Sequence, residues 1–313
     1  MSGYRFCRTD DIGLLVDALN RCWSPYFPDE PPMTPAAFKR SIRDLQVWCS
    51  SCMVAFSDSD PIGVLIGAKR PSGTLVHKVA VHPDHRRQGH GRHLLESLGS
   101  KLAILGPPRI VAEVPETLAP ACALFSASGY VQEALLTDYV LQHEQDDLQF
   151  ARGAHFVIPV TIDDLAANGL LGDAPSTPLA SARQVHPQVC WEHSVETLTA
   201  RKDEITGLAV ASDERIEAYL LYVKDEEGTP EIVSLRTFIE DGGARLNLLL
   251  SRLGMGTVRF PQVHPAEISK ELLKTLGFRA AGGIVLYAAT LRPFESLRVA
   301  PGQVESRQRS GSP

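Results

Sequence analysis

The sequence lacks any run of apolar residues near the length of about 20 that a membrane-spanning helix requires. Its first residues, MSGYRFCRTDDIG, have neither the basic start nor the apolar middle of a secretory signal peptide. These two absences predict a cytoplasmic protein. In that reducing compartment the six cysteines are expected to be free thiols.

An excess of positive charge is also missing. The formal net charge is −6 and the sequence pI is about 5.9, so the long basic face of a nucleic-acid-binding protein is not expected. A local basic cluster inside such an acidic chain instead favours a small anionic ligand. With 44% hydrophobic and 22% charged residues, the composition is that of a globular protein that can bury a core.

The spacing of the cysteines and histidines does not favour a metal site. Cys49 and Cys52 form a C-x-x-C pair, but the second pair that a structural zinc site would need is absent. Two pairs of histidines three residues apart occur between residues 82 and 93, with no carboxylate or cysteine cluster beside them. We therefore expect no bound metal.

The chain of 313 residues is long enough for two domains of about 150 residues each. Hydrophobic periodicity over residues 4–142 predicts a strand, two helices, three strands, a helix, a strand, a helix and a strand. Residues 155–291 repeat most of that order, which indicates a duplicated mixed α/β (α+β) domain. The predicted domains are residues 1–147 and 148–293, and the polar residues 294–313 are expected to be a disordered tail.

The most informative stretch is VHKVAVHPDHRRQGHGRHLLESL, residues 76–98, in which a strand pattern ends at a proline and a leucine-rich helix pattern begins. Two arginines and the sequence Gly-His-Gly lie between them. The first turn of a helix has unpaired N–H groups that attract anions, and nearby glycines let a phosphate approach the backbone. The stretch therefore predicts a phosphate or pyrophosphate site, although it is neither a P-loop nor the three-glycine dinucleotide motif. The alternative is a plain strand-to-helix turn with solvated arginines.

The same stretch resembles motif A of the GCN5-related N-acetyltransferase (GNAT) superfamily, an Arg/Gln-x-x-Gly-x-Gly/Ala sequence after a strand that ends in Val-x-Pro. Arg86, Gly89 and Gly91 fit the three defined positions, and Val-His-Pro ends the strand. The predicted order of elements over residues 4–142 also matches that family. The resemblance implies two tandem GNAT-like domains, each a mixed, mostly antiparallel twisted sheet flanked by helices.

The resemblance also implies the ligand, which is acetyl-CoA, and no metal. In the family the end of the strand pairs with the pantetheine arm, and loop amides hold the pyrophosphate. The neighbouring strand splays away there, which opens the slot where thioester and amine meet. The residues expected to bind acetyl-CoA are Val79, Ala80, Val81, Arg86, Arg87, Gln88, Gly89, His90, Gly91 and Arg92.

Acetyl transfer requires a neutral amine, so a base must take the amine's proton. Glu113, in RIVAEVPE, matches a glutamate that members of the family often carry on the strand after motif A. Its alternative role is a carboxylate that faces solvent at the end of a strand. His77, beside the splay, is the second candidate base, or else it packs against a neighbouring strand. Strand alternation places Lys78 on the face opposite to His77.

Two positions depart from the family pattern. Leu118 stands where an asparagine is usual, and Phe125 stands where a tyrosine usually acts as the acid. Phenylalanine cannot donate a proton, so another group protonates the thiolate or the thiolate leaves unassisted, which a thiol pKa of about 8.5 allows. Tyr130 has the position of the family's packing aromatic, and Tyr139 is an alternative acid that the spacing does not support.

In the second half, SLRTFIEDGGARLNLLLSRLG takes the place of motif A. Gly242 and Gly243 precede the helix, but Glu240 and Asp241 put negative charge where a pyrophosphate would lie. The resemblance therefore implies a degenerate copy without cofactor, which covers a sheet edge or forms one wall of the acceptor pocket. The Pro-rich loop of residues 24–35 is expected to form the other wall. Length and layout resemble the mycothiol synthases, in which the working site lies in the C-terminal half.

The sequence thus predicts an acetyl-CoA-dependent N-acetyltransferase that acts on a primary amine of a small molecule or a protein terminus, by direct attack on the thioester. The alternative, based on the missing asparagine and tyrosine, is a non-catalytic acyl-CoA-binding sensor or scaffold. The expected partner is a small-molecule amine or a peptide acceptor, with no nucleic acid and no membrane. The protein is expected to be a monomer or a homodimer.

Overall fold

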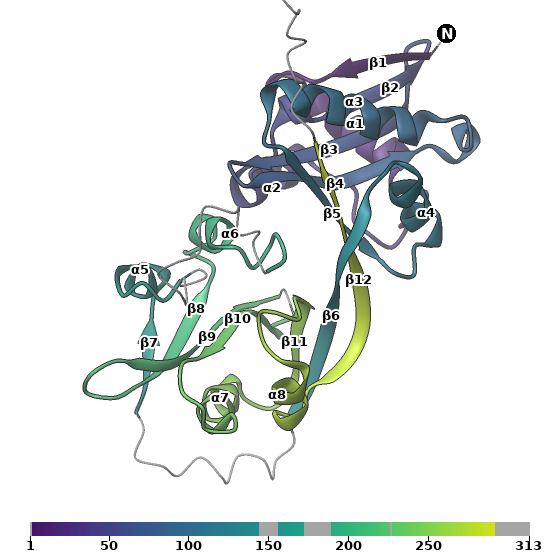
Figure 1. Cartoon of the computed structure of the whole chain (residues 1–313). Helices are drawn as coiled ribbons and strands as arrows, with labels where there is room; N and C mark the ends of the chain where they lie inside the picture. The colour runs from purple at the N-terminus through teal and green to yellow at the C-terminus, as the bar shows by residue number, and fades with distance from the viewer. Residues whose placement is uncertain (1, 144–155, 172–188, 226, 292–313) are drawn as a thin grey trace, which may run out of the picture.

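The computed structural model describes residues 2–143, 156–171, 189–225 and 227–291. These residues form one twisted 12-stranded sheet with helices packed against it (Figure 1). Neighbouring strands are antiparallel except at two parallel pairs, one in each half of the chain. The predicted mixed α/β architecture with a mostly antiparallel sheet is therefore confirmed.

The elements of both halves follow the predicted order. Those of the first half are β1 (Ser2–Phe6), α1 (Ile12–Cys22), α2 (Pro35–Leu45), β2 (Met53–Ser57), β3 (Asp60–Arg70), β4 (Gly73–Val81), α3 (His90–Leu105), β5 (Arg109–Pro115), α4 (Ala119–Ala127) and β6 (Val131–His143). Those of the second half are β7 (Phe156–Val160), α5 (Ile162–Ala167), α6 (Val195–Ala200), β8 (Thr206–Ala211), β9 (Ile216–Lys224), β10 (Pro230–Thr237), α7 (Ala244–Leu250), β11 (Gly256–Val263), α8 (Lys270–Thr275) and β12 (Arg279–Thr290). Helix α6 was not predicted.

The last strands of the two halves are exchanged. The order along the sheet is β1-β2-β3-β4-β5-β12-β6-β11-β10-β9-β8-β7. The first five strands of the first half, β1 to β5, are followed by β12 of the second half and only then by β6. From the other end, β7 to β11 are followed by β6 of the first half and only then by β12. β12 pairs with both β5 and β6, and β6 also pairs with β11. Figure 1 shows β6 and β12 side by side where the two halves meet.

Strand β12 contributes side chains to both hydrophobic cores of the first half. One core lies between the sheet and helices α1 and α2, and it includes Leu286 and Ala288. The other lies under helices α3 and α4, and it includes Val285 and Tyr287. All four side chains are buried, so the first half packs around the last strand of the sequence.

Several expectations concern the chain as a whole. The predicted domain boundary between residues 147 and 148 and the tail of residues 294–313 lie outside the described residues. The strand exchange means that residues 1–147 alone would lack β12 between β5 and β6.

The six cysteines are free thiols, and five of them are buried. No helix in the described part of the chain is long and apolar enough to cross a membrane.

Deleting residues 279–313, which include β12, is expected to destabilise the first half, although residues 76–98 are untouched. Burial of each large apolar side chain contributes about 1.5–3 kcal/mol, so the free energy of unfolding should fall by at least ~3 kcal/mol. Urea unfolding followed by circular dichroism measures the change. Deleting only residues 292–313 is the control, and it should leave the midpoint unchanged. Equal midpoints for both deletions would show that β12 is dispensable.

Candidate functional site

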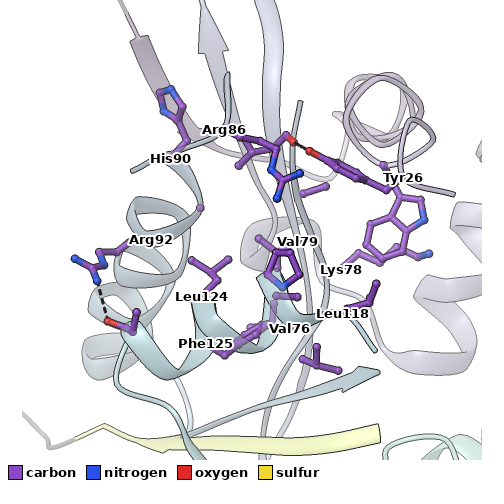
Figure 2. A pocket seen from close by; sticks show the side chains of 18 of the residues that line it. Tyr26, Val76, Lys78, Val79, Arg86, His90, Arg92, Leu118, Leu124 and Phe125 are labelled. Atoms are coloured by element: carbon purple, nitrogen blue, oxygen red, sulfur yellow. Dashed lines mark hydrogen bonds between the residues drawn. The ribbon is translucent and has the colours of Figure 1, made fainter. Parts of the chain in front are cut away.

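A pocket of about 560 Å³ lies where β4 and β5 separate. The two strands pair only at Thr74 with Ile110 and at Leu75 with Val111, so the rest of β4 has no β5 partner. Side chains from both strands, the start of α3, helix α4 and the loop between α1 and α2 line the opening (Figure 2). The separation therefore exposes the backbone edge of β4 inside a pocket.

A β-bulge interrupts β4 beside this pocket. Ile66 of β3 pairs with Lys78, but the next residue, Gly67, pairs with Val76, so His77 is an extra residue in β4. All six residues 76–81 line the pocket, on both sides of the bulge. The placement of Lys78 on the face opposite to His77 stays a prediction.

The free edge of β4 presents backbone polar groups to the opening. The His82 N–H donates to the Ile62 carbonyl at 2.9 Å, which defines the residues whose backbone groups point toward β3. By the alternation of an antiparallel ladder, the N–H and C=O groups of Val79 and Val81 point the other way, into the pocket. The Tyr26 hydroxyl donates to the Val81 carbonyl at 2.6 Å. An extended ligand could pair with the other groups of this edge, as a further strand would.

The turn from β4 into α3 shapes the charged end of the pocket. Arg87 and Gly89 both have left-handed backbone conformations, with φ of 63° and 88°. Gly89 precedes the first residue of α3, so the free amides of the helix follow directly. A Cβ atom on Gly91 would lie 3.1 Å from the Leu124 Cδ2 atom of α4. A larger residue at 91 would therefore require the Leu124 side chain to shift by a few tenths of an ångström.

Nine of the ten residues predicted to bind the cofactor line the pocket, and Gln88 does not. Three of the nine have side chains in contact with other groups. The Arg92 guanidinium donates to the Ala127 carbonyl of α4 at 3.1 Å (Figure 2). The His90 Nδ1 atom lies 2.6 Å from the Tyr4 hydroxyl of β1. The Arg86 guanidinium lies 5.4 Å from the centre of the Tyr26 ring, inside the pocket. The side chains of Arg86 and Arg87 are therefore the candidate phosphate ligands of the turn.

Glu113 lies on β5 and lines the same pocket. Its Oε1 atom accepts a hydrogen bond from the backbone N–H of Trp191, at 2.7 Å. Burial raises the pKa of Glu113 to about 7, and the Trp191 hydrogen bond opposes that rise. A carboxylate with this pKa is part ionised and part protonated near neutral pH, as a general base requires.

His77 differs from Glu113 in its protonation. Burial, with a contribution from the charge of Lys78, lowers the pKa of His77 to about 4, so the imidazole is neutral at pH 7. The Lys78 ammonium lies 3.9 Å from the centre of the Trp23 ring and 3.7 Å from the Glu30 carboxylate. In the described part of the chain, no group of three or more His, Cys, Asp or Glu side chains could hold a metal ion.

The two positions that depart from the family pattern also lie at the pocket. Leu118 and Phe125 both line it. Phe125 is buried between Tyr130, which meets it edge-on at 5.1 Å, and Tyr287 of β12, which stacks on it at 5.8 Å. Tyr139 lies in the core of the second half and does not line the pocket, so it is excluded as the acid.

Sequence reasoning missed two contacts of the site. The Pro-rich loop was expected as a wall, and its residue Tyr26 does line the pocket, but the bond from Tyr26 to Val81 was not foreseen. Trp191 reaches Glu113 from the second half, and no local motif signals a contact between segments this far apart. Among the described residues, the second half contributes no side chain to the pocket lining.

The second half has a similar turn before α7, and a side chain of the protein already occupies its amides. Gly243 precedes α7 with a φ of 90°, as Gly89 does before α3. The Asp241 carboxylate accepts hydrogen bonds from the N–H groups of Gly243 and Arg245, each at 3.0 Å. The Arg245 side chain pairs with Asp241 at 2.8 Å and with Glu217 at 2.6 Å. The chain's own carboxylate therefore binds the amides that a phosphate would need.

The raised pKa of Glu113 predicts a pH-dependent effect of Glu113→Gln on stability. Ionisation is disfavoured in the folded state, so the native protein loses stability as pH rises from 4.5 to about 7. Glutamine keeps the hydrogen bond from Trp191 without that cost. The melting temperature of the variant should exceed that of the native protein by about 2–6 °C at pH 8, and by little at pH 4.5. Calorimetry across this range checks it, and a difference that stays constant with pH would contradict it.

Comparisons with known proteins agree with this geometry. Residues 14–130 match the model of the acetyltransferase (GNAT) family, whereas no curated protein sequence matches the chain. A tandem GNAT protein from the clavulanic acid biosynthesis pathway is similar, with a TM-score of 0.60 and 17% identity over 94% of this chain and 99% of that chain. A GCN5-related N-acetyltransferase from Sphaerobacter thermophilus has a TM-score of 0.58 and 15% identity over 93% of this chain and 96% of that chain. A third, from Anabaena variabilis, has a TM-score of 0.60 and 12% identity over 93% and 73% of the two chains.

At these low identities the likeness to solved structures shows the fold alone. The chain thus has a tandem GNAT fold, and residues 14–130 match the model of the acetyltransferase (GNAT) family.

Proposed function

We propose that this protein is an acetyl-CoA-dependent N-acetyltransferase that acetylates a primary amine of a small molecule or a protein terminus. The observation that carries the proposal is the single pocket in which the free edge of β4, the arginine- and glycine-containing turn before α3 and the Glu113 carboxylate come together. The match of residues 14–130 to the family model supports acyl transfer in general.

The residues of the pocket fit acetyl-CoA, which supplies an activated acetyl thioester. The amides of the turn before α3 would hold the pyrophosphate, and Arg86 and Arg87 would add charge-assisted contacts. The backbone of Val79 and Val81 would pair with the amides of the pantetheine arm. Asp241 makes the matching turn of the second half unsuitable for an anion, so we propose one working cofactor site in each chain.

Glu113 is the proposed base, which takes the proton of the acceptor amine. His77 has a lowered pKa, so we propose that it acts as a neutral hydrogen-bonding group that lines the acceptor side. None of the cysteines lines the described pocket, which supports direct attack of the amine on the thioester without an acetyl-enzyme. Because Phe125 cannot donate a proton, we propose that the thiolate leaves without a dedicated acid.

The second candidate function is a non-catalytic acyl-CoA-binding sensor or scaffold. Leu118 and Phe125, which replace the usual asparagine and tyrosine, favour it. Protection of the protein by acetyl-CoA in a melting assay is expected for both functions. Release of CoA across a panel of primary amines separates them, because a sensor would bind acetyl-CoA and release no CoA with any amine.

Cofactor binding is tested by Gly89→Glu. An added side chain at Gly89 would meet no neighbour, but the φ of 88° strains any residue other than glycine, so the control must carry the same strain. The glutamate would repel a pyrophosphate. Binding of acetyl-CoA, measured by calorimetry, should weaken at least ~100-fold. Gly242→Glu is the matched control, because Gly242 also has a positive φ and open space but lies in the occupied turn before α7. Unchanged binding by a folded Gly89→Glu variant would rule out the assigned site.

The role of Glu113 is tested by the pH dependence of turnover. For an amine that the panel identifies as a substrate, kcat/KM should rise with pH through about 7, because the base must be ionised. Glu113→Gln should lower kcat by about 100-fold or more and remove this rise, with little change in acetyl-CoA binding. A variant that keeps both the rate and the pH profile would show that another group is the base.

A further inference from the structure

We infer that a segment of the second half, residues 190–197, positions the base of the first half and is therefore part of the catalytic machinery. In this arrangement Trp191 orients Glu113 through its backbone N–H, and Arg70 holds Trp191 in place. The inference rests on the proposed role of Glu113. It assigns to the half without a cofactor site a role in proton transfer rather than in cofactor binding.

The contact with Glu113 is specific. The Trp191 N–H donates to the Glu113 Oε1 atom at 2.7 Å, within the range of a strong, charge-assisted hydrogen bond. This bond restrains the rotation of the carboxylate, and it favours the ionised form that accepts a proton. Beside it, Glu113, Arg70 and Trp191 line a second cavity of about 40 Å³. One backbone group of the second half thus acts directly on the candidate base.

Trp191 is held by the first half as well. Its indole Nε1–H donates to the carbonyl of Leu45, the last residue of α2, at 2.9 Å. The guanidinium of Arg70, on β3, lies 3.9 Å from the centre of the indole ring and donates to the Trp191 carbonyl at 3.2 Å. Only 8% of Trp191 is exposed. The position of its N–H is therefore fixed from three sides.

Arg70 makes an unusual set of contacts for a buried cation. It is 4% exposed, and its hydrogen bonds run to neutral oxygens: Gln46 Oε1, the Trp191 carbonyl, Ser194 Oγ and Thr197 Oγ1. Burial of a guanidinium among neutral acceptors is costly to stability, and burial lowers the pKa of Arg70 to about 10. The three bonds to Trp191, Ser194 and Thr197 instead hold residues 191–197 against the sheet of the first half.

The charged groups around Glu113 come from both halves. Glu192 raises its pKa, whereas His193 and Arg70 lower it. His193 is itself paired with Glu267 of the second half at 3.3 Å. In the two cavities that Glu113 lines, the other titratable neighbours include His77, which is neutral at pH 7, and Arg109, which is paired with Glu133. Burial is therefore the main cause of the raised pKa of Glu113, and residues 191–193 and Arg70 modify it.

The direct test is a carboxyl titration of Glu113 by NMR. The full-length protein, labelled with ¹³C at the glutamate carboxyl carbons, is titrated, and Glu113→Gln assigns the signal. In Arg70→Gln the loss of the cation and the loosening of Trp191 should raise the pKa of Glu113 by about one unit. Arg70→Lys, which keeps the charge but not the planar fork, should give an intermediate shift.

Two further variants complete the test. Arg43→Gln removes another contact between the halves, the exposed pair of Arg43 with Glu204 at 2.8 Å, and should leave the pKa of Glu113 unchanged. Trp191→Phe keeps the backbone N–H but loses the bond to Leu45, and it replaces Arg70→Gln if that variant fails to fold. An unchanged Glu113 pKa in the folded variant would overturn the inference.

A parallel measurement separates this inference from the proposed function. With an amine substrate, the rise of kcat/KM with pH should move upward in Arg70→Gln by the same amount as the NMR pKa, while acetyl-CoA affinity stays within about twofold. If Arg70→Gln shifts the NMR pKa but not the kinetic profile, Trp191 positions Glu113 and Glu113 is not the base. If neither moves, the positioning role itself is wrong.

Discussion

The exchange of β6 and β12 is the constraint on which the rest of the structure depends. Each half of the sheet has its own first five strands, then the last strand of the other half, then its own. The exchange places side chains of β12 in both cores of the first half. It also brings the two halves together, so that Trp191 can reach Glu113. The halves are therefore coupled through their backbones, and the site of one depends on the other.

The turns before α3 and before α7 have similar backbones but carry side chains of opposite charge. Both have a glycine in a left-handed conformation directly before a helix. Before α3, Arg86 and Arg87 line an open pocket, whereas before α7 the Asp241 carboxylate already binds the helix amides. A helix N-terminus binds a single anion well, so an internal carboxylate excludes an external phosphate. The second half instead contacts the pocket residue Glu113 through the backbone N–H of Trp191.

The elements and the glycine-containing turn before α3 could be predicted from the sequence, because both leave local signals in hydrophobic periodicity and glycine spacing. Sequence reasoning placed Glu113 and His77 at a site, and both line the pocket. The exchange of β6 and β12 could not be predicted, because pairing between distant strands leaves no mark in either one. The bulge at His77 was not predicted for a similar reason, since it appears only in the pairing of β4 with β3. Trp191 acts through a backbone N–H, which every residue except proline has.

The central claim is that one cofactor site, in the first half, works with a base that the second half positions. A crystal structure of the protein with CoA tests this most directly. We expect one CoA in each chain, with its pyrophosphate at the amides before α3 and its sulfur between β4 and Glu113. We also expect the hydrogen bond from Trp191 to Glu113 to be retained. A CoA bound at the turn before α7, or a sulfur remote from Glu113, would contradict this claim.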